Sequence, residues 1–436
     1  MQNLSVMIIG SGAREHAISC AYERSSFVKE IIVAPGNDFI TFNRKKEVVI
    51  EKSCNLKEPE TFLRLAKIHK PDLIDVAQDD ALAAGTVDLL QKNGFLVFGP
   101  KKEAAKIEWD KHWSREFMRR HKIPCPAFAY FSDVDKAKNY VKELYAENPK
   151  TALYIKATGL CFGKGALKTE NLQEAFANID MMKTFGDAGK TFLIEETLKG
   201  EEFSYFVICD GKHYVSLISS KDHKTVFDHD KGSQTGGMGV VAPTLITKDR
   251  EKEIEEKLIA PVLRGMKKEK LPFTGILYLG GIIVHEKPMN IEYNARWGDP
   301  ECQTILPGIK TDYTELVFSC LQGKLAKINL EQDKKVRVCV VGASKGYPEE
   351  YSQVKGKQIY GIEQALKLKG ISIFGSAIKM NHGKFYADGG RVLSIVAEAD
   401  TLSDARKLAY SAMKMISIDG NNLHYRTDIG ARDLGK

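Results

Sequence analysis

A segment rich in glycine and lysine near position 160 has the composition of a phosphate-binding loop. The segment KATGLCFGKG, residues 156–165, follows directly after the strand-like run TALYI. A P-loop requires the pattern G-x-x-x-x-G-K-[ST], but Gly159 lies only four positions before Gly163, and Gly165 stands where Ser or Thr is needed. The P-loop interpretation therefore fails on two counts, and the rest of the chain has to indicate what this segment binds.

A second group of reactive side chains lies in the segment IEYNARWGDPE. In an extended strand Glu292, Asn294 and Arg296 project to one side, whereas Ile291 and Tyr293 face the core. Carboxylate and amide oxygens suit a Mg²⁺ ion that bridges nucleotide phosphates, and the adjacent guanidinium suits a charged acyl or phosphoryl group. The alternative is a solvated strand face with an incidental ion pair.

The segment IIGSGAREHA places Gly10 and Gly12 where a first strand ends and a helix begins. Such a turn can hold an anion at the helix N-terminus. The dinucleotide-binding fingerprint needs a third glycine at position 15, which is Glu15, and this argues against an NAD site. A turn that binds a phosphate or sugar phosphate and a turn without a ligand both fit these residues.

Two further loops have the composition of ligand-binding backbone. In FDHDKGSQTGGMG the positions Gly232, Gly236, Gly237 and Gly239 suit neither a helix nor a strand, which indicates close approach to a ligand or else a mobile loop. In FLIEETLKGEE a strand ends in acidic residues before Gly200. This pattern fits an interdomain hinge, or a strand end in water.

The composition indicates a globular protein of several domains. A chain of 436 residues, with 43% hydrophobic and 28% charged residues, suggests three or four domains of roughly 100 to 150 residues and no membrane span. The eight scattered cysteines form no C-x-x-C pair, which predicts reduced thiols and no zinc site. The net charge of +7 is spread over mixed stretches, so no nucleic-acid partner is expected. The first residues show no targeting segment, so we expect a cytoplasmic location.

The order of strand-like and helical runs predicts a mixed α/β and α+β multidomain fold. Residues 4–100 alternate the two, with one helix expected from Ala81 to Asn93, which favours a parallel sheet covered by helices. The run from Lys101 is expected to form a single helix that Pro124 closes. A small glycine-rich unit follows and is short enough to be a lid. Antiparallel hairpins are predicted next, with turns at Asp210-Gly211 and at residues 286–289. We predict domains at residues 1–122, 123–194, 195–327 and 328–436.

Taken together, these segments resemble the ATP-grasp superfamily and, within it, the glycinamide ribonucleotide synthetase family. The resemblance covers essentially the whole chain, and it implies an ATP-grasp fold with an N-terminal α/β domain, a lid and a C-terminal α+β domain. The motifs that carry it, in the order of that family, are GSGAREHA, VAPGN, FGP, IKATGLCFGKGA, IEETLKGEEFS, KDHK, TGGMG, IEYNARWGDPE and GGRVL.

The resemblance implies a role for each motif. The loop after strand lysine Lys156 folds over the ATP phosphates, and residues 195–198 read adenine through their backbone. The implied ATP-binding residues are Lys111, Lys156, Gly163, Lys164, Gly165, Glu195, Glu196, Leu198 and Glu202. The implied substrate-binding residues are Gly10, Gly12, Arg14, Asp222, Gly236, Gly237, Met238 and Arg296. Lys156, Arg296 and Asp222 are the implied catalytic residues, and Glu292 and Asn294 the implied ligands of Mg²⁺ or Mn²⁺.

The implied reaction is that of a carbon–nitrogen ligase in purine biosynthesis. Glycine attacks the γ-phosphate of ATP to give glycyl phosphate, and the amine of 5-phosphoribosylamine then displaces phosphate to form glycinamide ribonucleotide. Such chemistry needs positive charge on the transferring phosphoryl group and a lid that excludes water. It needs no side-chain nucleophile, and the partners are the three substrates of a monomeric enzyme.

Two other hypotheses fit parts of the sequence. A ligase or carboxylase that uses another acid, such as bicarbonate, would share the ATP site, and a non-catalytic nucleotide sensor would share the fold. The sequence departs from the family pattern where Asp79 replaces a glutamate, at Thr158, and at Ser233 and Gln234. These departures concern substrate binding and lid closure more than the ATP site.

Overall fold

The structure is a computed structural model that describes residues 3–159, 161 and 165–435. Two expected ATP-binding residues, Gly163 and Lys164, lie outside the described residues. None of the helices in the described part of the chain has the length and apolar composition that a membrane crossing requires.

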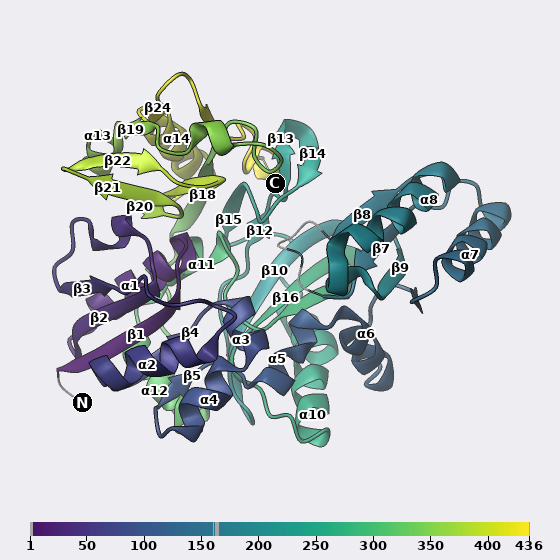
Figure 1. Ribbon diagram of the computed structural model, residues 1–436, viewed down its shortest axis with the longest axis horizontal. Coiled ribbons are helices and arrows are strands. Elements are labelled where there is room, and N and C mark those ends of the chain that lie inside the picture. Colours follow the sequence, from purple (N-terminus) through teal and green to yellow (C-terminus); the bar gives the residue numbers. More distant parts are fainter. Residues whose placement is uncertain (1–2, 160, 162–164, 436) are drawn as a thin grey trace.

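The N-terminal part is a parallel sheet of five strands in the order β3-β2-β1-β4-β5 (Figure 1). Its strands are β1 (Leu4–Gly10), β2 (Val28–Pro35), β3 (Glu47–Ile50), β4 (Leu73–Val76) and β5 (Val97–Phe98). Its helices are α1 (Ala13–Arg24), α2 (Pro59–His69), α3 (Asp79–Ala84), α4 (Thr86–Lys92) and α5 (Lys102–Trp109). Strand order reverses between β1 and β4, and ligands of open parallel sheets bind at the carboxyl ends of such strands.

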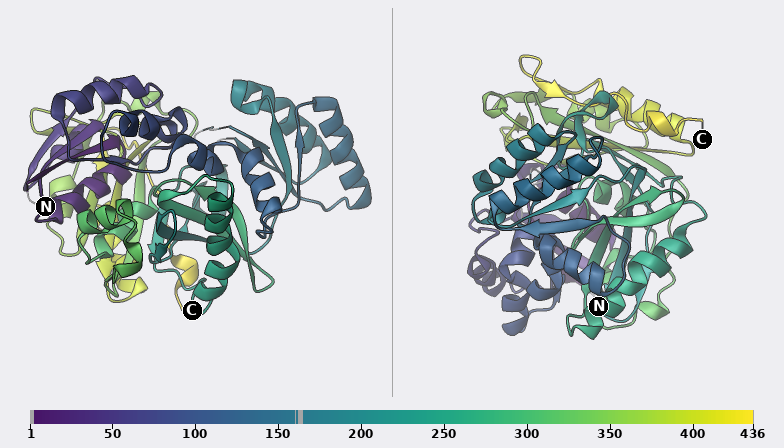
Figure 2. Two further views of the ribbon diagram at one scale, coloured as in Figure 1. Left: turned by 90° about the horizontal axis from the view of Figure 1, so that it is seen from below. Right: turned by 90° about the vertical axis from the view of Figure 1, so that its right-hand side faces the viewer.

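A small antiparallel unit, the lid, projects from the rest of the molecule (Figures 1 and 2). Its sheet has the order β6-β9-β7-β8. The elements are β6 (Phe128–Phe131), α7 (Val134–Glu147), β7 (Leu153–Ala157), β8 (Ala166–Thr169), α8 (Leu172–Met181) and β9 (Phe192–Glu196). Asp133 and Asn171 begin its two helices by accepting backbone N–H groups of the first turn. Helix α6 (Lys111–Arg120) connects it to the N-terminal part.

The central body is an antiparallel sheet in the order β11-β10-β16-β17. Its strands are β10 (Glu201–Asp210), β11 (Tyr214–Ser216), β16 (Thr274–Val284) and β17 (Lys287–Asn294). The remaining elements here are β13 (Thr225–Phe227), β14 (Lys231–Gln234), α9 (Glu251–Ile254), α10 (Ala260–Lys268), α11 (Glu301–Ile305) and α12 (Tyr313–Leu321).

The C-terminal part adds two more sheets. The larger has the order β12-β15-β18-β23-β20, with β25 beside β18, and begins with strands β12 (Lys221–Asp222) and β15 (Gly239–Ala242) of the central body. The smaller has the order β21-β22-β19-β24. The elements are β18 (Val336–Ser344), β19 (Gln358–Tyr360), α13 (Ile362–Leu366), β20 (Ile371–Gly375), β21 (Ile378–Asn381), β22 (Lys384–Ala387), β23 (Arg391–Ala399), α14 (Leu402–Met413), β24 (Ser417–Ile418) and β25 (Leu423–His424).

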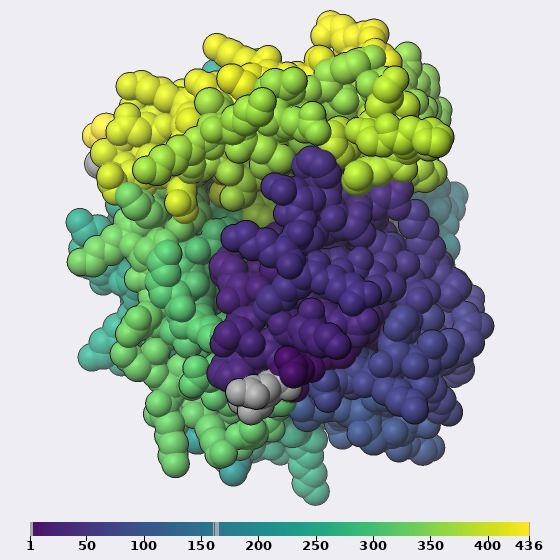
Figure 3. Space-filling view, turned by 90° about the vertical axis from the view of Figure 1, so that its left-hand side faces the viewer, coloured from purple at the N-terminus to yellow at the C-terminus, as the bar shows by residue number. Residues whose placement is uncertain are grey.

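Hydrophobic packing joins all parts except the lid. Strand β1 is buried on both faces: Val6 and Ile8 pack in a core shared with the central and C-terminal parts, and Met7 and Ile9 pack in a second core. Figure 3 shows the N-terminal part directly against the C-terminal part. The lid has its own core, whose buried residues all lie between positions 137 and 194. A unit with a separate core can change its orientation without exposing the core of its neighbour.

The predicted mixed multidomain fold is confirmed, and the structure corrects some of its elements. The helix expected from Ala81 to Asn93 is two helices, because Gly85 has a left-handed backbone with φ of 90°. The helix expected across residues 101–122 is also two, since Asp110 caps α6. The second hairpin turns at His285 and Glu286, earlier than predicted. Strand β3 and helix α7 were not predicted, and the four domain boundaries stay predictions.

The fold buries a carboxyl group behind the carboxyl end of β4. Asp75 is 2% exposed, and its Oδ2 accepts a hydrogen bond of 2.8 Å from the Tyr22 hydroxyl. Burial raises the pKa of Asp75 to about 7, against the effect of that hydrogen bond; Glu15 adds to the rise and Arg14 opposes it. The folded protein therefore holds a proton here that the unfolded chain releases near pH 4.

We predict that Asp75 makes the folded state less stable as pH rises from about 4 to about 7, because the raised folded pKa favours folding only while the carboxyl is protonated. Asp75→Asn keeps an acceptor for Tyr22 and removes this effect. Its free energy of unfolding should exceed that of the wild type at pH 8 by up to about 4 kcal/mol, and the difference should vanish near pH 4. Urea unfolding at pH 4.5, 6 and 8 tests this; parallel pH profiles would contradict it.

Candidate active site

A cavity of about 530 Å³ lies where the N-terminal part, the lid and the central sheet meet. The lid contributes side chains of β7 and β9, and the central sheet contributes those of β16 and β17. The N-terminal sheet contributes residues that follow β1 and β4. These are the strands between which the strand order reverses, and a ligand is expected at their carboxyl ends. Two antiparallel sheets thus enclose a space that a parallel sheet closes at one end.

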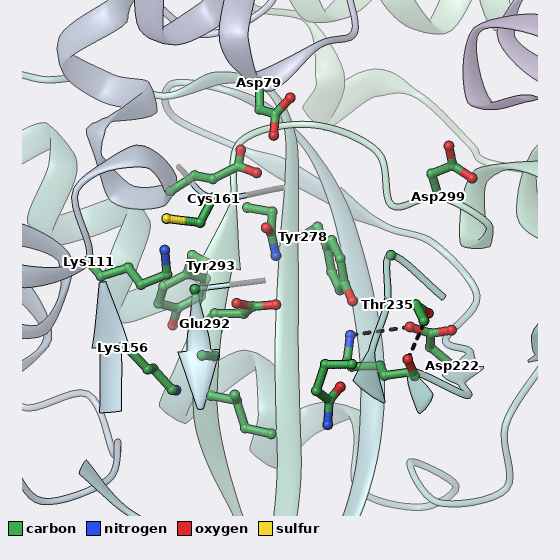
Figure 4. A pocket seen from close by; sticks show the side chains of 18 of the residues that line it. Asp79, Lys111, Lys156, Cys161, Asp222, Thr235, Tyr278, Glu292, Tyr293 and Asp299 are labelled. Atoms are coloured by element: carbon green, nitrogen blue, oxygen red, sulfur yellow. Dashed lines mark hydrogen bonds and ion pairs between the residues drawn. The ribbon is translucent and has the colours of Figure 1, made fainter. Parts of the chain in front are cut away.

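Three lysines act on one carboxylate in this cavity, and Figure 4 labels two of them. Lys111 and Lys156 lie on one side of Glu292, and Asp222 lies on the other. Burial would raise the pKa of Glu292, but the ammonium groups of Lys224, Lys156 and Lys111 outweigh burial and lower it. Glu292 is therefore ionised at neutral pH, in a region where three ammonium groups lie around it. Such a region suits a polyanion such as the phosphates of a nucleotide.

Each lysine also has an oxygen partner. Lys156 Nζ lies 2.7 Å from Glu195 Oε2, and Lys224 Nζ lies 3.2 Å from Asp222 Oδ2. Lys111 Nζ donates to the Gly159 carbonyl at 3.1 Å, and burial lowers the pKa of this lysine while Glu292 opposes the shift. The three ammonium groups are held on separate elements, α6, β7 and the segment after β12, which keeps them apart and yet directed at one cavity.

Asp222 lies at the end of the cavity away from the lid. Burial raises its pKa to about 7, although Lys224 opposes the shift; Glu301 adds to it. Glu301, at the start of α11, accepts hydrogen bonds from Tyr278 at 2.8 Å and from Ser204 at 3.0 Å. Asp222 therefore titrates near neutrality, the range in which a carboxylate can exchange a proton with a substrate.

The expected alternation along β17 is wrong at Ile291. Gly280 of β16 pairs with Glu292, but Gly281 pairs with Asn290, so Ile291 is the extra residue of a β-bulge. The bulge turns Ile291 into the cavity, where it is half-buried, whereas Tyr293 is 1% exposed and donates to the Leu258 carbonyl as a core residue does. The expectation for Tyr293 holds, and the expectation for Ile291 does not.

Beyond the bulge, Asn294 and Arg296 both line the cavity beside Glu292. Arg296 Nη2 contacts Glu108 Oε1 at 2.7 Å and donates to Asn294 Oδ1 at 3.3 Å. Asn294 Nδ2 is buried and finds no hydrogen-bond partner in the described part of the chain, so this amide has bonding capacity left over in the cavity. The oxygen atoms that fit Mg²⁺ are those of the Glu292 carboxylate and Asn294 Oδ1, which accepts one contact from Arg296 and has a second lone pair; the unpaired Nδ2 is an N–H donor and suits a phosphate or substrate oxygen instead.

Among the described residues, no three His, Cys, Asp or Glu side chains gather as a metal-binding group. The predicted ligand set therefore supplies two side chains, Glu292 and Asn294. A Mg²⁺ ion bound there would need phosphate oxygens and water to complete its coordination.

The N-terminal turn brings Gly12 and Arg14 to the cavity but leaves Gly10 out of its lining. Gly10 has φ of 143°, and a Cβ there would lie 2.4 Å from Glu15 Cγ. Glu15 Oε2 accepts the Gly12 N–H at 2.6 Å and its Oε1 contacts Arg14 Nε at 2.6 Å. Glu15, which stands where the dinucleotide fingerprint has its third glycine, therefore positions Arg14. A further partner of Arg14 is Gln78, after β4.

The TGGMG loop is only partly in the cavity. Gly236 lines it, whereas Gly237 does not, and Met238 is fully buried. Arg391, from β23 of the C-terminal part, reaches into the cavity and donates to the carbonyls of Gly236 and Asp299, each at 2.8 Å. The loop is thereby tied to the C-terminal part of the chain.

The expected hinge lies at the lid end of the cavity. Glu195, Glu196, Leu198 and Glu202 all line it, as does Gly165. The Glu195 side chain is 1% exposed and is occupied by charged partners, so any contact with a base here falls to the backbone and to Leu198.

The cavity residues that were not predicted include four on the central and C-terminal elements, Lys224, Tyr278, Glu301 and Arg391. Three belong to segments that were noticed, namely KDHK, RWGDPE and GGRVL, but nothing in these segments alone shows that they meet. Tyr278 gave no signal at all, because a tyrosine in an apolar strand is usually a core residue.

The cavity lies between a lid sheet and a central sheet, and its lysines face a carboxylate and an amide. This arrangement defines an ATP-grasp protein. The chain matches three profiles of one family in succession: "Phosphoribosylglycinamide synthetase, N domain" over residues 4–108, "ATP-grasp (A) domain" over residues 109–302 and "C domain" over residues 337–432. The chain belongs to the phosphoribosylglycinamide synthetase family, which confirms the resemblance found in the sequence.

Individual relatives agree with this assignment. The phosphoribosylamine–glycine ligase of Caldanaerobacter subterraneus subsp. tengcongensis is 38% identical over 432 residues, which span 98% of this chain and 100% of the relative. The crystal structure of phosphoribosylamine–glycine ligase from Thermotoga maritima matches with a TM-score of 0.81 and 29% identity, over 98% of this chain and 100% of that chain.

A more distant likeness concerns the fold alone. The biotin carboxylase domain of Hydrogenobacter thermophilus 2-oxoglutarate carboxylase, solved with MgADP and bicarbonate, matches with a TM-score of 0.71 at 16% identity, over 98% of this chain and 92% of that chain.

We predict opposite effects for the two neighbours in the bulge. Ile291→Ala removes an apolar wall of the cavity and should weaken nucleotide binding, with at most about 1 kcal/mol lost in stability because the side chain is only half-buried. Tyr293→Ala creates a core cavity and should cost about 3 to 5 kcal/mol. Urea unfolding and calorimetric titration with ATP compare the two variants. A larger stability loss for Ile291→Ala would contradict the bulge.

Proposed function

We propose that this protein is an ATP-dependent ligase that joins glycine to 5-phosphoribosylamine and releases glycinamide ribonucleotide, ADP and phosphate. Membership of the family supports the reaction, and the charge pattern of the cavity supports its first step. The observation that carries the proposal is the convergence of Lys111, Lys156 and Lys224 on Glu292 in a cavity that also holds Arg296.

In the first step the glycine carboxylate attacks the γ-phosphate of ATP, which breaks the bond to ADP and forms glycyl phosphate. The charge that develops on the transferring phosphoryl oxygens lies within reach of the lysine groups, which are fixed before the reaction. Mg²⁺ bound by Glu292 and Asn294 would neutralise phosphate charge further. Adenine would lie against Leu198, Ile291 and the backbone of residues 195–198, at the lid end.

In the second step the amine of 5-phosphoribosylamine attacks the acyl carbon, and phosphate leaves. The attacking nitrogen has to lose a proton, and Asp222, whose pKa is raised to about 7 chiefly by burial, can accept it. The sugar phosphate would lie toward the N-terminal turn, where the Arg14 guanidinium lines the cavity beside Gly12, whose own N–H is bonded to Glu15. Arg296 and Gly236 border the space between the two substrates.

The lid would keep water from the acyl phosphate, because glycyl phosphate hydrolyses if water reaches it. Its separate hydrophobic core allows it to close as a unit. We keep the expected monomeric state and cytoplasmic location as predictions.

A carboxylase that uses bicarbonate is the second candidate, because a biotin carboxylase domain shares the fold. A nucleotide sensor without turnover is the third. Incubation of the purified protein with Mg²⁺–ATP and each acid, with and without 5-phosphoribosylamine, distinguishes the three. We expect formation of ADP and glycinamide ribonucleotide in equal amounts only when glycine and the amine are both present. ADP release with bicarbonate, or binding of ATP without turnover, would contradict the proposal.

We predict that Glu292→Gln shifts the Mg²⁺ dependence of turnover to higher concentration, because the substitution removes one negative charge from the expected ligand set and keeps its shape. A fall in kcat of about tenfold to a thousandfold at saturating Mg²⁺ is also expected. Turnover measured against Mg²⁺ concentration tests this.

The matched control for this prediction is Glu202→Gln, at the lid end of the same cavity. It changes charge equally but should move the KM for ATP without moving the Mg²⁺ curve. A wild-type Mg²⁺ curve for Glu292→Gln would remove Glu292 from the metal site.

A further inference from the structure

Arg115, on helix α6, pairs with a buried carboxylate at the lid end of the cavity and was not expected from the sequence. Its side chain is 5% exposed. Arg115 Nε lies 2.6 Å from Glu195 Oε1, and Nη2 lies 3.0 Å from Oε2, so the guanidinium binds both carboxylate oxygens. Two parallel contacts of this kind are the strongest that a carboxylate makes with a side chain.

The same carboxylate holds the phosphate lysine. Glu195 Oε2 lies 2.7 Å from Lys156 Nζ. Strands β7 and β9 are antiparallel, with Tyr154 opposite Glu195 and Lys156 opposite Leu193, so Lys156 and Glu195 are diagonal neighbours on one face. Burial alone would raise the pKa of Glu195, but Arg115 and Lys156 lower it to about 2. The carboxylate is therefore ionised throughout the neutral range.

These contacts set the charge available to a nucleotide. Arg115, Glu195 and Lys156 together carry one net positive charge. A phosphate oxygen has to compete with Glu195 for Lys156. A buried carboxylate loses one cationic partner at a low cost in free energy only if another cation still pairs with it. Arg115 is that second cation, and its contacts with Glu195 do not involve Lys156.

Arg115 also belongs to a different part of the molecule from its partners. Its neighbours on α6, Phe117 and Met118, pack in the core of the N-terminal and central parts, whereas Lys156 and Glu195 lie in the lid sheet. Arg115 Nη2 donates as well to the carbonyl of Ile291 at 2.6 Å, in the bulge beside Glu292. One guanidinium thus joins the lid to the strand that carries the expected metal ligands.

We propose that Arg115 is a positioning residue that neutralises Glu195 and thereby frees Lys156 to exchange this carboxylate for a phosphate of ATP. The inference rests on the nucleotide role proposed above. Loss of the arginine charge leaves Glu195 with Lys156 as its sole cation, so the lysine stays on the carboxylate and phosphate binding weakens.

Calorimetric titration with Mg²⁺–ATP, without the other substrates, tests this in three variants. Arg115→Gln should raise the Kd at least about tenfold. Arg115→Lys retains the charge and should stay within about threefold of the wild type. In Arg115→Gln/Glu195→Gln the net charge returns to plus one and no carboxylate holds Lys156, so the Kd should also return to within about threefold. A role limited to stability would give the double variant no such recovery.

The matched control is Arg337, a buried arginine of β18 outside the cavity, which contacts Asp333 at 2.6 Å and Glu398 at 2.7 Å. Arg337→Gln should lower the urea midpoint and leave the Kd for ATP unchanged. If Arg115→Gln fails to fold, Arg115→Lys and the double variant still decide the question.

Two results would overturn the role of Arg115: wild-type affinity in Arg115→Gln, or a double variant that binds as weakly as the single one. A folded wild-type protein that does not bind Mg²⁺–ATP would instead contradict the proposed function.

Discussion

Three ammonium groups directed at one cavity repel one another, and the rest of the structure depends on the carboxylates that balance this repulsion. Lys111, Lys156 and Lys224 share the Glu292 carboxylate as a central counter-charge, which they keep ionised against the effect of burial. Two of them have a second carboxylate of their own, Glu195 or Asp222, and the third is held by a carbonyl oxygen. The result is a set of ammonium groups whose positions are fixed before any phosphate arrives, which is the arrangement that phosphoryl transfer requires.

The architecture follows from the need to bring these groups together. Each charge lies on a different element, and no single sheet could present all of them to one space without placing like charges on neighbouring strands. The central sheet carries Glu292, the lid sheet carries Lys156 with Glu195, and α6 carries Lys111. The lid is joined to the body by polar contacts of this kind, by a backbone hydrogen bond from Lys111 to Thr158 and by stacking of His112 on Tyr130, whereas its hydrophobic core is its own. Contacts around the cavity and along α6, and not a shared apolar core, therefore connect the two.

Local patterns predicted much of the fold and part of the site. The alternation of strands and helices in the first 100 residues, the hairpin at Asp210-Gly211 and the terminal strands all depend on neighbours in sequence, and the structure has them. The helix breaks at Gly85 and Asp110 were missed because each is caused by one residue, and the apolar pattern on both sides of it is helical. Gly237 and Met238 share a loop with Gly236, yet burial removes them from the cavity, and sequence does not report burial within a loop.

The sequence by itself determined the family, the order of the motifs and the side chains whose chemistry is local: Lys111 and Lys156 beside glycine-rich or helical segments, and Glu292 and Asn294 on one strand with Arg296 two residues after it. Tertiary structure alone decided that Lys224, Glu301 and Arg391 meet there, because their strands and helix belong to parts of the chain that only packing brings together. It also decided the direction of Ile291. The alternation rule assumes unbroken pairing, and the bulge opposite Gly280 and Gly281 depends on the register between two strands, which neither strand encodes alone.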